Sequence, residues 1–292
     1  MARPRRFRVL HATDGSARAR AAMATSAAFP WPGHCEARAI VVRPGRFLPP
    51  HPDLWARSEA VTRRAAAAAL RTLRARWTEA DPVIRDGDVA DQILAEASDW
   101  GAHALVIGWR GHGRFQRLLM GSVSRAVLRR ATTPVLVVRR GSRAVTGIVV
   151  GVDGSAASDR AIRLLARCDV PQRGLITLVT VLPSQSLPGH RLLPGLTAEL
   201  RAQVRAQVAK SRAAAERRQE RLAGRLRQVG WRVRGQVRAG APLFELLRSV
   251  DETGADVLVV GATSQRSIIK GFLGSTTEGA VNDSAVPVLV VP

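Results

Sequence analysis

The chain has 292 residues, too many for one typical small domain and comfortable for two of about 140 to 150 residues each. Its hydrophobic fraction of 46% is usual for a globular protein, and no apolar run approaches the roughly 18 residues that a membrane span needs. These values argue against a membrane-spanning protein and predict a soluble chain with two sizeable cores.

Basic residues dominate the charge, because 45 Lys and Arg against 23 Asp and Glu give a formal net charge of +22. Arginine carries nearly all of it, since lysine occurs only at positions 210 and 270. Such a charge is compatible with a polyanion-binding face, but we favour a solvated arginine-rich surface in an alanine-rich chain. Aromatic residues, which would stack on bases, make up only 4% of the chain, so we expect no specific nucleic-acid partner.

The N-terminal stretch and the cysteines bear on location. The first residues are basic, contain no apolar signal core and pass directly into a strand-like segment, so we expect a cytoplasmic protein. Cys35 and Cys168 lie one in each half, beside core-like residues and without CxxC or Cys/His spacing. We therefore expect buried free thiols rather than a disulfide or a metal site.

The first half of the chain alternates short apolar runs with helical stretches. Runs rich in β-branched residues predict five strands, at 6–12, 36–42, 82–86, 104–108 and 134–138. Alanine- and arginine-rich stretches of helical period separate them. Near-continuous apolar strands between helices are typical of a parallel sheet that is covered on both faces. The first half therefore predicts a doubly wound α/β domain.

The second half repeats this order, with "DGS" at 14–16 and 153–155 and "PVLVV" at 134–138 and 287–291. The other second-half strands are predicted at 147–152, 175–181, 231–237 and 257–261. A long helix over 196–229 is predicted to pack on its own sheet through Val204, Val208, Leu222, Leu226 and Val229. The offset between the halves grows from 139 to 153 residues, and we place the extra residues in the Pro/Gly-rich stretch 183–195.

This repeat defines the domain organisation. We expect one domain over 1–143 and a second over 144–292, with a short join near 140–146. The predicted fold is α/β: two tandem, doubly wound, five-stranded parallel-sheet domains of Rossmann-like architecture.

Two strand ends of the first half carry residues suited to a ligand. In doubly wound domains, ligands bind beyond the carboxyl ends of the strands. There the chain has "TDGS" after the first strand and, after the fourth, the spacing G-x2-G-x9-G-S formed by Gly108, Gly111, Gly121 and Ser122. Glycine lets a backbone approach a phosphate closely, and the N–H groups of a helix opening at Ser122 would favour an anion. The sequence therefore predicts a phosphate-binding loop.

This ordered set of motifs resembles the universal stress protein family, specifically its ATP-binding branch in a tandem arrangement. The resemblance rests on "DGS", the glycine loop and the closing "PVLVV" strand, found in that order in both halves, and it covers nearly the whole chain. It implies an adenine nucleotide alpha hydrolase-like fold, ATP as ligand with or without Mg²⁺, and packing of the two domains through their last strands. A homodimer and a regulatory protein partner are also implied.

On the nucleoside side, the resemblance implies contacts by Asp14, beside Gly15, and by the backbone of Val41, which matches the residue after the second strand. A carboxylate can accept hydrogen bonds from hydroxyl or amine groups. Asp14 also fits a simpler role, the cap of the helix that begins near Ser16.

On the phosphate side, the implied residues are Gly108, Gly111, Gly121, Ser122 and Val123, and Arg110 in the same loop could pair with phosphate oxygens. The alternatives are that Ser122 caps a helix without a ligand and that the glycines only shape a loop. His112 and Arg114 lie in the same loop. Because no nucleophile or second acid accompanies His112 in the motif, we expect a solvent-facing histidine rather than a general base.

The second domain departs from the pattern at one position. Its corresponding residues are Asp153, Val181, Gly261, Gly274 and Ser275. Ser264, however, stands where the second glycine of the loop is expected. A side chain there would add bulk beside a phosphate and strain any positive φ. We therefore expect a weaker nucleotide site in the second domain than in the first.

Three functions are compatible with the sequence. The leading interpretation is an ATP-binding stress-response protein that senses or sequesters nucleotide and signals through conformation or partners. A slow ATPase or phosphotransferase is the second, but the chain has neither a P-loop G-x4-G-K-[ST] nor an evident acidic Mg²⁺ pair beside the glycine loop. The third is a basic polyanion-binding protein. We expect nucleotide binding without efficient turnover, and hence no catalytic residues.

Overall fold

A computed structural model describes residues 6–43, 52–110, 120–141, 144–182, 198–262 and 273–292. In the described residues of the first half, five strands and four helices alternate: β1 (Phe7–Ala12), α1 (Ala17–Ala28), β2 (Cys35–Arg43), α2 (Pro52–Arg74), β3 (Asp81–Asp86), α3 (Val89–Asp99), β4 (Ala104–Gly108), α4 (Ser122–Arg130) and β5 (Val135–Val138). The five strands expected from the sequence are confirmed.

The second half repeats the alternation. Its elements are β6 (Gly147–Gly151), α5 (Ala156–Leu165), β7 (Leu175–Leu182), α6 (Ala198–Gln228), β8 (Arg232–Ala239), α7 (Pro242–Thr253), β9 (Val257–Gly261), α8 (Ser275–Asp283) and β10 (Val288–Val291). Local signals set several helix ends: Ser16 and Ser155 cap α1 and α5, and Gly254 ends α7 with a φ of +60°.

All ten strands form one sheet, in the order β3-β2-β1-β4-β5-β10-β9-β6-β7-β8. Neighbours within each domain are parallel, whereas β5 and β10 pair antiparallel, with Leu136 opposite Leu289. This confirms the expected packing of the domains through their last strands, around a pseudo-twofold axis at that leucine pair. The antiparallel seam also makes the carboxyl edges of the two domains, where their parallel strands end, point in opposite directions.

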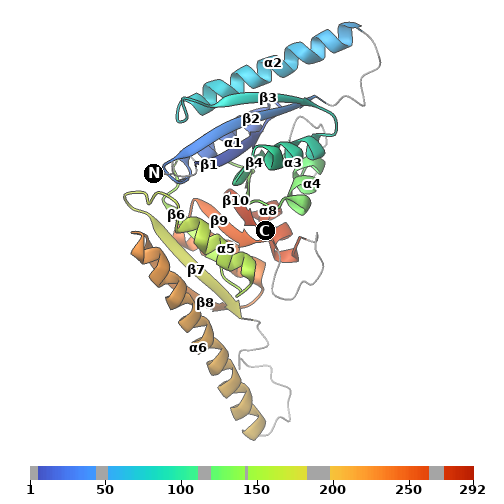
Figure 1. Ribbon diagram of the computed structural model, residues 1–292. Coiled ribbons are helices and arrows are strands. Elements are labelled where there is room, and N and C mark those ends of the chain that lie inside the picture. The colour runs from blue at the N-terminus through green and yellow to red at the C-terminus, as the bar shows by residue number, and fades with distance from the viewer. Residues whose placement is uncertain (1–5, 44–51, 111–119, 142–143, 183–197, 263–272) are drawn as a thin grey trace.

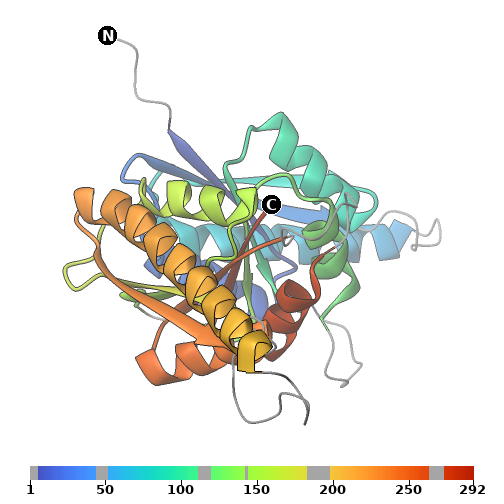
Figure 2. The ribbon, with the colours of Figure 1, turned by 90° about the horizontal axis from the view of Figure 1, so that it is seen from below.

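Helices cover both faces of the sheet (Figures 1 and 2). On one face, side chains of α1, α2, α5 and α6 join a single apolar cluster that includes Met23, Leu73, Ile162 and Leu226. On the other face, α3, α4, α7 and α8 contribute to a second cluster. Both clusters contain residues of both domains, so the two halves share their cores across the seam.

The long helix α6 differs in two respects from the sequence prediction. It has 31 residues against 23 in α2, so part of the extra length of the second half is helical and not confined to stretch 183–195, which lies outside the described residues. Leu222 and Leu226 are buried as expected, but Val229 follows the helix end and is 43% exposed. Figure 1 shows α2 and α6 at opposite ends of the molecule.

Strand register shows which residues of the two domains correspond. Leu10 lies opposite Leu105 and Arg38, and Val149 lies opposite Leu258 and Thr177. Positions in β1 and β2 therefore correspond to β6 and β7 at an offset of 139 residues. Positions in β3 and β4 correspond to β8 and β9 at an offset of 153.

One buried polar residue distinguishes the two cores. His11 in β1 is fully buried and corresponds to Val150 in β6. Its Nδ1 lies 3.3 Å from the Arg38 carbonyl oxygen, to which it donates, and its Nε2 therefore accepts from the Ser26 hydroxyl at 2.8 Å. Burial lowers the pKa of His11 from 6.5 to about 4, because the charged imidazolium would lose its hydration. The first domain thus carries a neutral histidine where the second has an aliphatic side chain.

Candidate functional site at the carboxyl edge

The turn after β1 places an exposed carboxylate at the carboxyl edge. Asp14 Oδ1 accepts from Ser16 N at 2.9 Å, and Gly15 supports the turn with a φ of +78°. The cap of α1 is Ser16, whose hydroxyl accepts from Ala19 N at 3.1 Å. The alternative role of Asp14, as the cap of this helix, is therefore wrong. Asp14 shapes the turn, and its side chain lies at the surface.

The segment after β4 folds back onto the end of its strand. Gly121 N donates to Trp109 O at 3.0 Å, and the Ser124 hydroxyl donates to Gly108 O at 2.8 Å. Helix α4 begins at Ser122 with Gly121 as its N-cap, so Ser122 is not the cap. Among the described residues no side chain caps this helix, and its first-turn N–H groups and partial positive charge are directed at the carboxyl edge.

The two segments meet at this edge. A Cβ placed on Gly108 would lie 3.5 Å from Ala19 N in the first turn of α1. A Cβ on Gly15 would lie 3.0 Å from the Ala65 Cβ of α2. Ala65 also packs with Val41 and Ala66 in a small apolar cluster. The structure therefore brings the Asp14 turn, the end of β2 and the end of β4 together, as the sequence predicted.

Val41 itself lies inside β2 rather than after it. It is buried and stands opposite Ile84 of β3. Sequence reasoning missed Ala65 and Ala66, which cover it. The run of alanines over 65–69 was the available signal, because small side chains on a helix permit close approach to the backbone below.

The glycines at this edge differ in what the fold requires of them. Gly15 is structural, because its positive φ and the close Ala65 both disfavour a side chain. Gly108 and Gly121 have no positive φ, and a Cβ on either would meet its neighbours at 3.4 Å or more, an ordinary contact distance. The described fold therefore gives no reason for glycine at 108 and 121, whereas a ligand that approaches the backbone would.

Several loop residues singled out by the sequence lie outside the described residues: Gly111, His112, Arg114 and Ser264. Arg110 is described and half-buried, and its guanidinium stacks on the Trp109 ring at 4.4 Å from the ring centroid. Arg139 covers the same ring at 4.8 Å. Val123 is half-buried and Ser122 is exposed. Sequence reasoning did not single out Trp109, which holds Arg110 beside the strand end.

The second domain reproduces the turn geometry. Asp153 Oδ1 accepts from Ser155 N at 2.9 Å, Gly154 has a φ of +85°, and Ser155 caps α5. The Thr277 hydroxyl donates to Gly261 O at 2.6 Å, as Ser124 does to Gly108.

The start of α8 and the end of β7 complete this second edge. Gly274 caps α8 without a side-chain hydrogen bond, and Ser275 begins the helix. Strand register corrects one expectation: Thr180, not Val181, corresponds to Val41. Val181 lies next to it in β7 and is half-buried.

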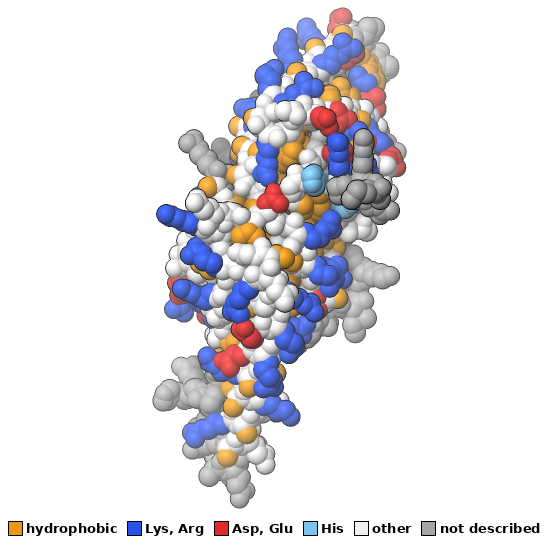
Figure 3. Space-filling view, turned by 60° about the vertical axis from the view of Figure 1, so that its left-hand side comes forward, with side chains coloured by type: hydrophobic (Ala, Val, Ile, Leu, Met, Phe, Trp, Pro, Cys, Tyr) orange, Lys and Arg blue, Asp and Glu red, His pale blue; other side chains and the backbone are white. Residues whose placement is uncertain are grey.

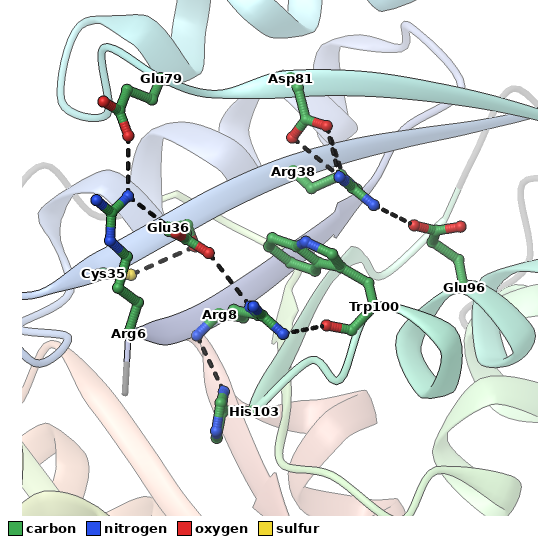
Figure 4. A network of polar contacts seen from close by, with 10 residues as sticks. All are labelled: Arg6, Arg8, Cys35, Glu36, Arg38, Glu79, Asp81, Glu96, Trp100 and His103. Atoms are coloured by element: carbon green, nitrogen blue, oxygen red, sulfur yellow. Dashed lines mark hydrogen bonds and ion pairs between the residues drawn. The ribbon is translucent and has the colours of Figure 1, made fainter. Parts of the chain in front are cut away.

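A cavity of about 400 Å³ lies at the opposite, amino edge of the first domain. Charged side chains line much of it, and they pair with one another (Figure 4). Arg6 bridges Glu36 and Glu79 at 2.9 Å each. Arg38 binds Asp81 at 2.7 Å and stacks on Trp100. Because these charges are mutually satisfied, the cavity is a weaker candidate for an anionic ligand than the carboxyl edge.

Other chemical groups bear on the sequence predictions. Burial raises the pKa of Cys35 to about 12 and also raises the pKa of Cys168, and both thiols are free. Within the described residues, no three His, Cys, Asp or Glu side chains gather as a metal site would require.

No described helix is long and apolar enough to cross a membrane. Basic side chains are spread from end to end of the face in Figure 3 and do not form one patch there.

Comparison with known proteins places this geometry in a family. The universal stress protein family model matches residues 6–139 and again residues 146–292. A universal stress protein of Mycolicibacterium smegmatis is 31% identical over 215 residues, which cover 71% of this chain and 67% of that protein. Universal stress protein Rv2005c of Mycobacterium tuberculosis is 27% identical over 201 residues, 65% of this chain and 61% of the relative.

A shorter sequence match and a match to a solved structure also lie in this family. Universal stress protein MJ0577 of Methanocaldococcus jannaschii is 30% identical over 77 residues, so the match spans about half, 48%, of that relative. The crystal structure of a universal stress protein from Archaeoglobus fulgidus has a TM-score of 0.67 at 19% identity and covers 97% of both chains, which shows a common fold. With both halves matched, the chain belongs to the universal stress protein family as a tandem of two domains.

Proposed function

We propose that this chain binds ATP at the carboxyl edge of its first domain and acts as a nucleotide-dependent regulator of the stress response. The observation that carries the proposal is the pair Gly108 and Gly121. Neither needs a positive φ and both have room for a Cβ in the described fold, yet both face the edge where Asp14 and the uncapped start of α4 meet. A bound phosphate explains the absence of side chains there.

The parts of this edge suit the parts of a nucleotide. The N–H groups at the start of α4 favour phosphate oxygens. The Asp14 carboxylate is exposed and can accept from a hydroxyl or amine, and Val41, Ala65 and Ala66 offer an apolar surface for a base. We propose Mg²⁺ as the companion ion of the ATP phosphates.

The proposal is one of binding rather than of turnover, with a homodimer and a regulatory protein partner in the cytoplasm. A slow ATPase or phosphotransferase and a polyanion-binding protein remain the alternatives raised by the sequence. The glycine pair would serve a slow ATPase equally, so the preference for binding over turnover rests on the sequence, which has neither a P-loop nor an evident acidic Mg²⁺ pair beside the glycine loop.

The test is the nucleotide that the protein retains. Gently purified protein would be denatured, and the released small molecules identified by mass spectrometry. We expect ATP, and we expect added ATP to raise the melting temperature of the stripped protein, because a ligand that binds only the folded state stabilises it. A protein that retains no nucleotide and whose melting is indifferent to ATP would contradict the proposal.

A further inference from the structure

The two carboxyl edges differ in the helix that covers them. In the first domain, Ala65 of α2 lies against Gly15, and Val41 packs with Ala65 and Ala66. At the offset of 153 residues, α6 places Arg218 and Gln219 at these two alanine positions, as the matched burial of Leu73 and Leu226 also indicates.

Arg218 and Gln219 form hydrogen bonds at the places where Ala65 and Ala66 form apolar contacts. Arg218 Nη2 donates to the carbonyl oxygen of Gly154 at 3.0 Å, where Ala65 meets Gly15. Gln219 Nε2 donates to the Thr180 hydroxyl at 2.9 Å, where Ala66 meets Val41. A small apolar set in the first domain is thus replaced, contact by contact, by larger polar side chains in the second.

One more pair of corresponding residues differs in its contacts. In α1, Arg20 donates to Gly15 O at 2.6 Å from an exposed position. Its counterpart in α5 is Asp159, which accepts from Arg218 Nη2 at 3.3 Å. The guanidinium of Arg218 is therefore held by a carboxylate and a carbonyl together, and its charge is already paired.

Gln219 is held just as firmly. It is 4% exposed, and its Nε2 also donates to Gln236 O of β8 at 2.9 Å. A nucleoside between the Asp153 turn and the end of β7 would have to displace two side chains: Arg218, which is bound to the turn at Gly154, and Gln219, which is bound to β7 at Thr180. In the first domain, Ala65 and Ala66 of α2 border the same place, and the arginine that binds the Gly15 carbonyl, Arg20, comes from an exposed position on α1.

Resting on the proposed function, we propose that Arg218 and Gln219 close the second carboxyl edge from within, so that the chain takes one adenine nucleotide, in its first domain. Arg218 has one feature that favours a rival role: its Nε is buried without a hydrogen-bond partner in the described structure, so it has a donor to offer. If Arg218 were instead a phosphate ligand, its removal would weaken the second domain's binding rather than create it.

The test is the number of ATP molecules that the full chain binds, measured by calorimetric titration. We expect one site in the wild type, whose affinity falls about tenfold in Asp14→Ala. Because Ser264 could by itself oppose a second site, the edge is opened in a Ser264→Gly background. We expect Ser264→Gly/Arg218→Ala/Gln219→Ala, and to a lesser degree Ser264→Gly/Arg218→Ala, to bind a second ATP. The matched control Ser264→Gly/Arg217→Ala, which removes a neighbouring exposed arginine, should keep one site.

The outcomes separate the two proposals. Two sites in the wild type, with one lost in Asp153→Ala, would overturn the closure of the second edge and leave the proposed function standing. One site in both opened variants, with an unchanged circular dichroism spectrum, would do the same. If neither the wild type nor any variant binds ATP, both proposals fail together.

Discussion

The two domains share a backbone but not a surface at their carboxyl edges. Asp14 and Asp153 make the same 2.9 Å bond to the serine that caps the next helix, and Gly121 and Gly274 open α4 and α8 in the same way. The difference lies in the covering helices, which present alanine over one edge and arginine with glutamine over the other. A repeated motif therefore does not ensure a repeated site, because residues outside the motif decide whether a ligand has room.

The strongest way to break this comparison is to give the first domain the arginine of the second. In Ala65→Arg, a long charged side chain would enter the buried contact with Gly15 and cover the Asp14 turn. We expect ATP affinity to fall roughly 1,000-fold, or about 4 kcal/mol, in a calorimetric titration. Ala67→Arg, on the exposed side of α2, is the control and should bind normally. Retained affinity in a folded Ala65→Arg protein would show that α2 does not border the ligand.

The second contrast between the domains is the buried His11, which should make stability depend on pH. The pKa of His11 falls from 6.5 to about 4 on folding, so the unfolded chain takes up a proton first as pH decreases. The neutral histidine contributes its full stability above pH 6.5, and between pH 6.5 and 4 the free energy of unfolding should decrease by about 3 kcal/mol from this group. His11→Val, which copies Val150, should remove that part of the pH dependence in denaturant titrations. An unchanged pH dependence in the variant would contradict the assignment.

The glycine caps allow a sharper comparison with an internal control. Gly121 and Gly274 have nearly the same backbone conformation, with φ of −62° in both, so valine should cost each helix a similar amount. We expect Gly121→Val to weaken ATP binding about 30-fold, or about 2 kcal/mol, and to remove most of the ATP-induced rise in melting temperature. Gly274→Val should keep that rise. Equal effects of the two substitutions would mean that the start of α4 is not the phosphate site.

The smallest expected effect separates the two aspartates. Asp14→Ala and Asp153→Ala both remove the side-chain hydrogen bond to the serine of the turn, so the loss of stability from that bond should be alike. Asp14→Ala should in addition lower ATP affinity about tenfold, or about 1.4 kcal/mol, because it removes an acceptor from the ligand. Asp153→Ala should leave affinity unchanged. Loss of affinity only on mutating Asp153 would reverse the roles of the domains.

The sequence predicted the fold well because most strands are short apolar runs between helical stretches, and because the order occurs twice. It also identified the edge, since carboxyl ends of parallel strands must meet there. Single positions were harder. Ser122 was a candidate N-cap of α4, but the backbone makes Gly121 the cap. Val181 was predicted as the counterpart of Val41, whereas the sheet register, which aligns β2 with β7, makes Thr180 the counterpart.

The covering helices could not be compared from sequence for a physical reason. The extra residues of the second half enter between β7 and the last turns of α6, so an alignment of α2 with α6 has no anchor until both are packed on their strands. Ala65 and Arg218 show no similarity, and their contacts with Gly15 and Gly154, together with the matched burial of Leu73 and Leu226, reveal that they hold the same place.

The antiparallel seam has a consequence for synthesis of the chain. β5 is complete after residue 138, but its partner β10 spans residues 288–291, so a nascent first domain presents an unpaired strand edge while about half of the sequence is still to be made. Both strands read "VLVV", and their register centres on Leu136 and Leu289. Because β5 has the same sequence as β10, the β5 strand of one nascent chain can pair with the β5 edge of another in place of β10. Folding of the second domain onto β5 therefore competes with this pairing between chains.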